Sequence, residues 1–234
     1  MGAASRSALE AVVFDMDGVL VDSERPSLAL LQRLLAEAGI DRSVDDLRHV
    51  CGRPAPYMRR LLLDTLAGGE AAVNAFLERY AAGKLAQLEA GEVLVFAGVH
   101  ELLADLERRG LRRAVATSTQ ADLAMRRLRR FGLAEAFDTI VTGDQVARGK
   151  PAPDIFLRAA ERLGVAPERC LVVEDSVVGV RAGRSAGMRV VALSTTFPAE
   201  ALREADIVVS DAATLRARLD AVLRPAAPGA APSP

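Results

Sequence analysis

Tryptophan is absent from the 234-residue chain, and cysteine and histidine occur only twice each. Cys51 and Cys170 lie far apart in unrelated contexts, so they provide neither a disulfide framework nor a metal-binding motif. Aromatic residues make up only 4% of the chain and the net charge is −1, which gives no basis for a nucleic-acid-binding surface. These absences predict a cytoplasmic protein whose partner is a small molecule rather than a nucleic acid.

Long hydrophobic runs are also missing. No uncharged apolar run approaches about 18 residues, the length that a membrane span needs, and residues 1–10 lack the apolar stretch of a signal peptide. No membrane partner is therefore expected. The tail at 224–234 is rich in proline, alanine and glycine, which predicts disorder. Half of the residues are hydrophobic, enough for one compact domain with a small accessory domain, and nothing demands more than a monomer.

Short apolar segments bounded by turn residues alternate along the chain with amphipathic helical patterns. This alternation is typical of a parallel sheet covered by helices on both faces, so we predict an α/β fold. The predicted strands are 11–14, 93–96, 112–117, 138–141, 170–174, 189–193 and 206–210. The predicted helices between them are 98–109, 120–131, 152–163, 176–187 and 212–222.

A long helical stretch interrupts this alternation directly after the first predicted strand. Leucines within 27–38 follow helical spacing, and residues 45–90 continue the helical pattern without a strand signal. We interpret residues 24–95 as an inserted α-helical cap domain. Residues 1–23 and 96–223 then form the α/β core.

Two aspartates end the first predicted strand, at the sheet edge where α/β proteins bind ligands. Carboxylates as close as those of Asp15 and Asp17 repel each other unless a cation or a proton lies between them. Mg²⁺ prefers oxygen ligands and would remove this repulsion, leaving Asp15 as a nucleophile and Asp17 as a general acid and base. Gly18 would let a substrate approach the backbone closely. By itself, however, D-x-D-G at a strand end is as often a turn as a site.

Two further loops supply hydroxyls and a cation. Thr117, Ser118 and Thr119 follow a predicted strand, where their hydroxyls and amides either hold a phosphate or simply cap the next helix. Lys150 precedes another helix, where its ammonium is either a point charge for a phosphate or an ordinary surface cation. Its identity favours the first interpretation, because Lys84 and Lys150 are the only lysines among 30 basic residues.

A second acid pair, Glu174 and Asp175, ends the predicted strand at 170–174. Adjacent acids there either cap a helix or complete the oxygen shell of Mg²⁺. Each of the four loops is ambiguous alone. Because the carboxyl ends of parallel strands meet at one edge of a sheet, we expect all four to form a single phosphate site.

The four ordered motifs together closely resemble the haloacid dehalogenase superfamily. They are DMDGVLVDSE (15–24), VATST (115–119), GKPAPDIF (149–156) and VVEDSVVGV (172–180). The resemblance covers residues 10–215 and is to the branch of beta-phosphoglucomutase and phosphoglycolate phosphatase-like proteins. It implies a Rossmann-like sheet beneath a mobile four-helix cap.

The resemblance also implies roles in a reaction that passes through an aspartyl-phosphate. Asp15 is then the nucleophile and Asp17 the general acid and base, while Thr117 holds the phosphoryl group and Lys150 neutralises it. The implied Mg²⁺ site consists of Asp15, the main-chain oxygen of Asp17, and Asp175, with Glu174 beside them in support. The expected substrate contacts are Gly18, Ser118, Thr119 and Arg53.

Within the superfamily, the sequence favours a phosphatase for a small phosphorylated metabolite, a sugar phosphate or a related acid. Halide-displacing members lack the second aspartate, present here as Asp17. Phosphonate-cleaving members need a lysine early in the cap, whereas the corresponding region here carries Arg53 and the only cap lysine, Lys84, comes too late. Sugar phosphomutases of this branch usually have a histidine at the position of Ser27, so a phosphomutase is the alternative. A non-catalytic binding module on the same fold is a third possibility, disfavoured by the intact motifs.

Several other polar residues are interpreted as structural. Arginines within 126–130 lie on an amphipathic helix and are expected to form a solvated face rather than a polyanion site. His49 and His100 are isolated on helical patterns, and Cys51 is interpreted as packing. In the cap, Arg53 is the best candidate for a substrate contact because a guanidinium suits a phosphate or a sugar acid, and Arg79 is weaker.

Overall fold

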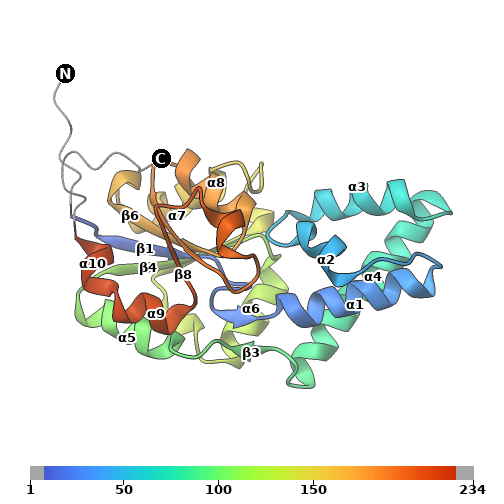
Figure 1. The fold of residues 1–234 in the computed structure, drawn as a ribbon, viewed down its shortest axis with the longest axis horizontal. Coiled ribbons are helices and arrows are strands. Elements are labelled where there is room, and N and C mark those ends of the chain that lie inside the picture. Colours follow the sequence, from blue (N-terminus) through green and yellow to red (C-terminus); the bar gives the residue numbers. More distant parts are fainter. Residues whose placement is uncertain (1–7, 225–234) are drawn as a thin grey trace.

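The computed structural model describes residues 8–224, and a six-stranded parallel sheet lies at its centre (Figure 1). The strands are β1 (Ala11–Phe14), β4 (Arg112–Thr117), β5 (Thr139–Thr142), β6 (Cys170–Glu174), β7 (Arg189–Leu193) and β8 (Ile207–Val209). Their order is β5-β4-β1-β6-β7-β8, with all pairings parallel. The predicted α/β fold is therefore confirmed. Residues 225–234 of the tail predicted to be disordered lie outside the described residues.

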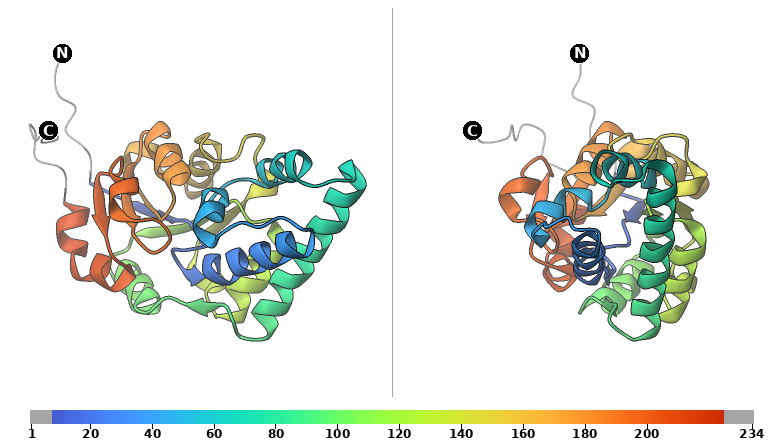
Figure 2. Two further views of the ribbon diagram at one scale, coloured as in Figure 1. Left: turned by 45° about the vertical axis from the view of Figure 1, so that its right-hand side comes forward. Right: turned by 90° about the vertical axis from the view of Figure 1, so that its right-hand side faces the viewer.

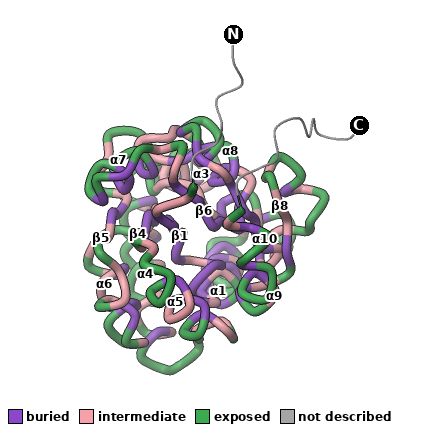
Figure 3. Tube along the Cα trace, turned by 90° about the vertical axis from the view of Figure 1, so that its left-hand side faces the viewer, coloured by how far each residue is buried: buried purple, intermediate pink, exposed green. Residues whose placement is uncertain are grey.

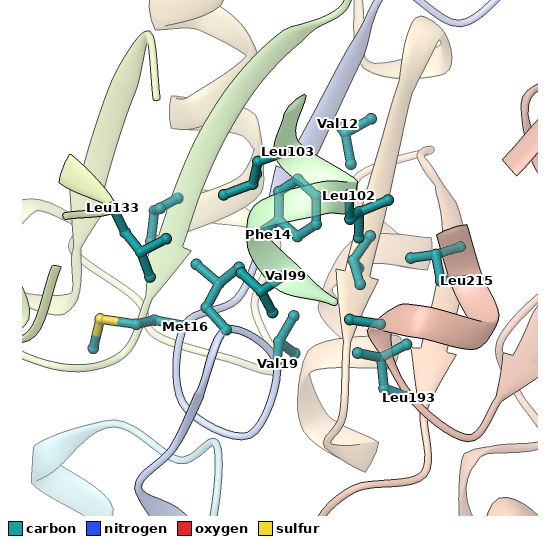
Figure 4. Packing of buried hydrophobic residues seen from close by; sticks show 14 of the residues in the cluster. Val12, Phe14, Met16, Val19, Val99, Leu102, Leu103, Leu133, Leu193 and Leu215 are labelled. Atoms are coloured by element: carbon teal, nitrogen blue, oxygen red, sulfur yellow. The ribbon is translucent and has the colours of Figure 1, made fainter. Parts of the chain in front are cut away.

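Helices cover both faces of the sheet, because successive side chains of a strand point to opposite faces. Helices α5 (Val99–Arg108), α6 (Ala121–Arg130), α9 (Ala212–Ala217) and α10 (Leu219–Leu223) cover one face, and α7 (Asp154–Leu163) and α8 (Val177–Ser185) cover the other. Val12 and Phe14 of β1 belong to the first core, and Ala11 and Val13 to the second. Figure 4 shows the first core, with Phe14 beside Leu102 of α5. In Figure 3 the buried residues follow the central strands.

Four helices between the first strand and α5 form a separate unit, here called the helical insert. They are α1 (Glu24–Glu37), α2 (Val44–Leu47), α3 (Ala55–Thr65) and α4 (Gly69–Glu89). The insert has its own hydrophobic cluster, which includes Leu31, Leu62 and Phe76. In Figure 1 and in the left view of Figure 2 it projects from the end of the sheet. The domain limits predicted at 23/24 and 95/96 remain predictions. No helix in residues 8–224 is both long and apolar enough to cross a bilayer.

The chain enters and leaves the insert through a small antiparallel ribbon. It pairs β2 (Val21–Asp22) with β3 (Leu94–Val95), and neither strand joins the main sheet. The strand predicted at 93–96 is therefore shorter than expected. It also lies outside the main sheet, because it pairs with Val21–Asp22 of the first motif. Short 3-10 helices complete the described fold at Arg48–Val50, Ala134–Ala136, Gly143–Gln145, Pro167–Arg169 and Ala199–Leu202.

The insert contacts the core directly at the carboxyl end of the sheet. Ser118 Oγ donates a hydrogen bond to the carbonyl oxygen of Gly52 at 3.0 Å, and Arg48 Nη1 donates to that of Thr196 at 2.7 Å. Gly52 has φ +73°, and a Cβ there would lie 2.4 Å from Ser176 Oγ, so glycine is required for this approach. The structure therefore has the insert closed over the strand ends.

Candidate active site

The residues predicted from the four loops meet at the carboxyl ends of β1, β4 and β6. Parallel pairing of Phe14 with Val115 and with Val173 aligns the three strand ends. Asp15 directly follows β1, Thr117 is the last residue of β4, and the β6 end carries the second acid pair. The structure therefore brings these groups together at one edge of the sheet; their roles remain predictions.

Lys150 lies between two buried carboxylates. Its Nζ donates to Asp15 Oδ1 at 2.6 Å, to Glu174 Oε1 at 2.7 Å and to the carbonyl oxygen of Ala116 at 3.2 Å, so all three ammonium hydrogens are used. The exposed fractions of the Lys150, Asp15 and Glu174 side chains are 0%, 5% and 0%. Burial alone would lower the pKa of Lys150, but the two carboxylates outweigh it and raise the pKa above its usual value. Lys150 is therefore a permanent cation beside Asp15.

Asp15 is the acid at the centre of this arrangement. Burial raises its pKa to about 8, against the opposing charge of Lys150, and the carboxylates of Glu174 and Asp17 add to the rise. The site therefore carries more negative charge than one lysine offsets. A cation bound against Asp15 would favour its ionised, nucleophilic form.

Glu174 holds the loop that follows β6. Its Oε2 accepts hydrogen bonds from the amide of Asp175 at 2.8 Å, the amide of Ser176 at 2.7 Å and Ser176 Oγ at 2.9 Å. A Cβ at position 179 would lie 1.7 Å from Glu174 Oε1, so Gly179 makes room for this carboxylate. Its other oxygen accepts from Lys150, so Glu174 holds Lys150 and the loop of Asp175 in place. A direct place for it on a metal remains a prediction.

The surroundings of Asp175 indicate whether the site could hold Mg²⁺. Asp175 Oδ2 is buried and has no hydrogen-bond partner among the described residues. Burial, and then the charges of Glu174 and Asp15, raise the pKa of Asp175 well above its usual value. Within residues 8–224 no three His, Cys, Asp or Glu side chains converge on one point. Mg²⁺, however, usually keeps several waters and needs only one or two carboxylates, so the acids here fit such an ion.

Gly18 contributes to this fit in a way that the sequence did not indicate. It has φ +80°, and a Cβ there would lie 1.8 Å from Asp175 Oδ2. Its carbonyl oxygen accepts a hydrogen bond from Thr195 Oγ1 at 2.5 Å. Glycine was expected to admit the substrate, whereas the group that approaches it is the Asp175 carboxylate. Its place as a substrate contact stays a prediction.

Asp17 has a separate set of partners, all donors. Its Oδ1 accepts from Ser23 Oγ at 2.5 Å, and its Oδ2 accepts from Thr119 Oγ1 at 2.6 Å and Thr117 Oγ1 at 3.4 Å. Arg127 Nη1 forms an ion pair with Oδ1. Burial alone would raise the pKa of Asp17, but Arg127 and the Ser23 and Thr119 hydroxyls outweigh it and hold the pKa below its usual range.

The burial of Arg127 corrects the prediction of a solvated face at 126–130. Its side chain is 3% exposed, and its Nε is buried without a partner among the described residues. The buried face of α6 consists of Ala124, Arg127 and Leu128, whereas Arg126 pairs with Asp122 at the surface. A guanidinium usually lies in solvent, but here the charge of Arg127 is neutralised by Asp17, 110 positions earlier in the chain.

A cavity of about 870 Å³ separates the helical insert from these strand ends. The lining includes all but two of the expected catalytic and substrate residues; the exceptions are Gly18 and Lys150, the latter buried beneath Asp15. The lining members are Asp15, Asp17, Thr117, Ser118, Thr119 and Arg53. The hydroxyl of Ser118 is committed to Gly52 and that of Thr119 to Asp17, and the Thr119 amide donates to Thr117 Oγ1 at 3.1 Å. The Ser118 amide is therefore the group left for a phosphate.

The residues of the helical insert that the sequence singled out differ in whether they reach the cavity. The Arg53 guanidinium stacks on the ring of Tyr57 at 4.4 Å, lines the cavity and keeps its buried Nε unpartnered among the described residues. Arg79 instead forms an exposed ion pair with Glu37 and is not part of the cavity lining. Cys51 is buried, as expected of packing, and burial raises the pKa of its thiol, with the nearby Glu24 carboxylate adding to the rise.

Comparison with known proteins identifies the family. A model of haloacid dehalogenase-like hydrolases matches residues 9–187 of the chain. The chain belongs to the haloacid dehalogenase-like hydrolase family. A hydrolase from Pseudomonas syringae superposes with a TM-score of 0.82 at 27% identity, covering 91% of this chain and 99% of that one.

Curated proteins also match the chain. The "Phosphorylated carbohydrates phosphatase" of Thermotoga maritima is 39% identical over 181 residues, which cover 77% of this chain and 82% of that protein. "Protein SUPPRESSOR OF QUENCHING 1, chloroplastic" of Arabidopsis thaliana is 37% identical over 202 residues, 84% of this chain. The match spans only 19% of that longer protein.

Proposed function

We propose that this phosphatase of the haloacid dehalogenase-like family hydrolyses a small phosphorylated metabolite through a phosphoryl group carried on Asp15. The observation that carries the proposal is the Lys150 ammonium, bonded to Asp15 at 2.6 Å beneath a cavity of about 870 Å³. The buried, charged lysine favours the ionised form of Asp15, and a further cation bound against this carboxylate would offset the burial that raises its pKa and leave it able to attack phosphorus. The phosphorylated-carbohydrate activity of the Thermotoga maritima relative supports a sugar phosphate as the substrate.

In the first step, an Asp15 oxygen forms a bond to phosphorus as the ester P–O bond breaks. Arg127 and the hydroxyls favour the ionised form of Asp17, so in this step Asp17 first takes up a proton with the substrate bound and then gives it to the departing alcohol oxygen. Thr117 contacts the transferring phosphoryl group, and Lys150 offsets its negative charge. Bound Mg²⁺, held by Asp15, Asp175 and the main-chain oxygen of Asp17, would supply further neutralisation of the phosphoryl oxygens.

In the second step, Asp17 takes a proton from water, and the water oxygen attacks phosphorus. The bond between phosphorus and Asp15 then breaks, which releases inorganic phosphate and restores both carboxyl groups. Contacts such as Ser118 with Gly52 keep the insert over the cavity and exclude bulk water from the first step.

The proposal gives Arg127 the task of a positioning residue. It contacts no expected substrate atom, but its ion pair and the Ser23 and Thr119 hydroxyls fix the carboxylate that must reach the leaving oxygen. Without the guanidinium, this buried carboxylate loses its counter-charge and one of its anchors. Loss of this cation also raises the pKa of Asp17, which favours its protonated form. Protonation of the leaving group should therefore suffer because the carboxyl group is no longer held in place, not because it lacks a proton.

For Arg127→Met we expect kcat/KM for an alkyl phosphate to fall about 100-fold, the range of lost general acid catalysis. The loss should be at least ten times smaller with p-nitrophenyl phosphate, because nitrophenolate leaves without a proton. Arg126→Met, which removes an exposed guanidinium from the same helix, is the control and should match the parent. Equal losses with the two esters would contradict the positioning role and indicate a structural one.

The overall proposal is tested by assaying the purified protein for phosphate release from p-nitrophenyl phosphate and from hexose phosphates, with Mg²⁺ and with excess chelator. We expect release that depends on Mg²⁺. Feeding glucose 1-phosphate separates the rival activity, since a phosphomutase would yield glucose 6-phosphate instead of free phosphate. The proposal fails if no ester releases phosphate, or if glucose 6-phosphate is the main product.

A further inference from the structure

The loop that follows β7, residues 194–198, lies beside the expected Mg²⁺ site although it belongs to none of the four motifs. We call it the β7 loop. Thr195 Oγ1 donates a hydrogen bond to the carbonyl oxygen of Gly18 at 2.5 Å. A Cβ at Gly18 would lie 1.8 Å from Asp175 Oδ2 and 2.7 Å from Thr196 Oγ1, so both oxygens face this glycine. The loop therefore supports the turn whose preceding main-chain oxygen is expected on Mg²⁺, and it lies next to the expected carboxylate ligand.

The β7 loop also holds the helical insert. The carbonyl oxygen of Thr196, a buried residue, accepts a hydrogen bond from Arg48 Nη1 at 2.7 Å. Arg48 is fixed from the other side by an ion pair with Asp45 of α2 at 2.6 Å. Phe197 packs against the hydrophobic cluster of the insert and also against the second core. Three successive residues of one loop thus join the expected metal site to the closed insert.

We propose that the β7 loop is a positioning element through which Mg²⁺ binding and closure of the helical insert favour each other. The inference rests on the proposed phosphatase function and concerns how its site is assembled. When the insert lifts, the bond from Arg48 and part of the packing of Phe197 are lost, so the loop is held less firmly against Gly18. When Mg²⁺ binds, it fixes the groups on both sides of Gly18, which fixes the partner of Thr195. Such a coupling acts equally in both directions.

The coupling suits the chemistry of the site. The acids at the strand ends carry more negative charge than Lys150 offsets, so a phosphate ester is repelled unless a cation is bound. Closure excludes bulk water and is useful only when that cation is in place. A loop that stabilises the closed insert more strongly with Mg²⁺ bound leaves the metal-free protein freer to open and exchange ligands.

The test titrates the substrate-free protein with Mn²⁺, which takes the same oxygen ligands as Mg²⁺ and is counted as free ion by electron paramagnetic resonance. Arg48→Met removes the donor to Thr196, and Thr195→Val removes the donor to Gly18 but leaves a side chain of similar size. We expect each variant to raise the Kd for Mn²⁺ about fivefold or more, the lower range of coupling between two sites. Arg48→Lys keeps a donor and should lie closer to the parent. Arg79→Met, which breaks an exposed ion pair of the insert, is the control and should match the parent.

Two further measurements separate coupling from simple packing. In the double variant Arg48→Met/Thr195→Val, the Kd should rise by less than the product of the single effects, because Arg48 acts on Gly18 through the loop that Thr195 anchors. Mg²⁺ should slow amide hydrogen exchange in residues 48–53 of the parent, since the coupling is reciprocal. It should not do so in Thr195→Val.

The coupling is overturned if Arg48→Met and Thr195→Val bind Mn²⁺ as tightly as the parent, or if their effects multiply in the double variant. It is also overturned if Mg²⁺ leaves exchange at residues 48–53 of the parent unchanged. Thermal unfolding without metal shows whether each variant is folded, and if Arg48→Met is not, Thr195→Val decides alone. Phosphate release from p-nitrophenyl phosphate by the parent reports separately on the phosphatase function, since its absence contradicts that function and not the loop.

Discussion

Replacing Asp15 with asparagine is expected to lower kcat for every phosphate ester by about 10⁴-fold or more, the scale of losing a covalent nucleophile. The amide is nearly isosteric with the carboxylate, so Lys150 can still donate to its oxygen and the local packing should persist. Its weak nucleophilicity is what removes the phosphoryl acceptor. The measurement is steady-state phosphate release with p-nitrophenyl phosphate and Mg²⁺, together with a thermal unfolding curve showing that the variant is folded.

A second measurement on the parent enzyme asks where the phosphoryl group goes. Rapid acid quenching with ³²P-labelled substrate should trap label on the protein, and treatment with hydroxylamine should release it, as expected of an acyl phosphate. Asp15→Asn should trap none. The matched control is Asp220→Asn, which removes an exposed carboxylate of α10 that pairs with Arg109. This variant should trap label like the parent. If Asp15→Asn turns over substrate as fast as the parent, Asp15 is not the nucleophile.

Much of the fold follows from local pattern. The apolar run 11–14 could only be a strand buried on both faces, and the alternation of such runs with amphipathic helices fixed a parallel sheet. The ribbon strand Leu94–Val95 was harder to place because two residues carry almost no periodicity. Its partner, Val21–Asp22, lies inside the first motif, whose acids indicate a catalytic loop rather than a strand.

The candidate site divides in a similar way. Groups that follow strands, such as Asp15 and Glu174, could be predicted together because the ends of parallel strands meet at one edge. Arg127 could not be placed by that rule, since it enters from the middle of a helix. A signal nevertheless existed: position 127 lies three residues after the buried Ala124 and next to the buried Leu128, on the apolar face of α6. A charge on that face needs a buried partner, which the sequence does not identify.

Glu24 illustrates a different limit. It lies within the motif at 15–24, but nothing in one sequence places it in the same cavity lining as Lys84 of α4, 60 positions later. The scarcity of lysine was read as support for Lys150 alone. The structure extends that compositional signal to Lys84, because both residues belong to one cavity and its floor.

Lys150→Met should both destabilise and inactivate the protein. It leaves the Asp15 and Glu174 carboxylates buried without their shared cation, and breaking a buried ion pair in this way typically costs about 3–5 kcal/mol of folding free energy. The loss of charge beside the phosphoryl group should lower kcat about 10³-fold, the upper range for removing one electrostatic contact. Chemical denaturation and phosphate release measure the two effects. Arg148→Met, which removes an exposed cation two positions earlier, should change stability by less than about 1 kcal/mol.

Two further variants separate charge from geometry. Adding Glu174→Gln to Lys150→Met removes one of the orphaned charges, so it should recover part of the stability but none of the activity. Lys150→Arg keeps the charge, yet the planar guanidinium is larger than the space of a side chain that is 0% exposed, and it cannot direct three hydrogens as the ammonium does. We expect that variant to remain at least 100-fold below the parent in kcat. If it retains full activity, position 150 requires only a positive charge, and the argument from the scarcity of lysine is wrong.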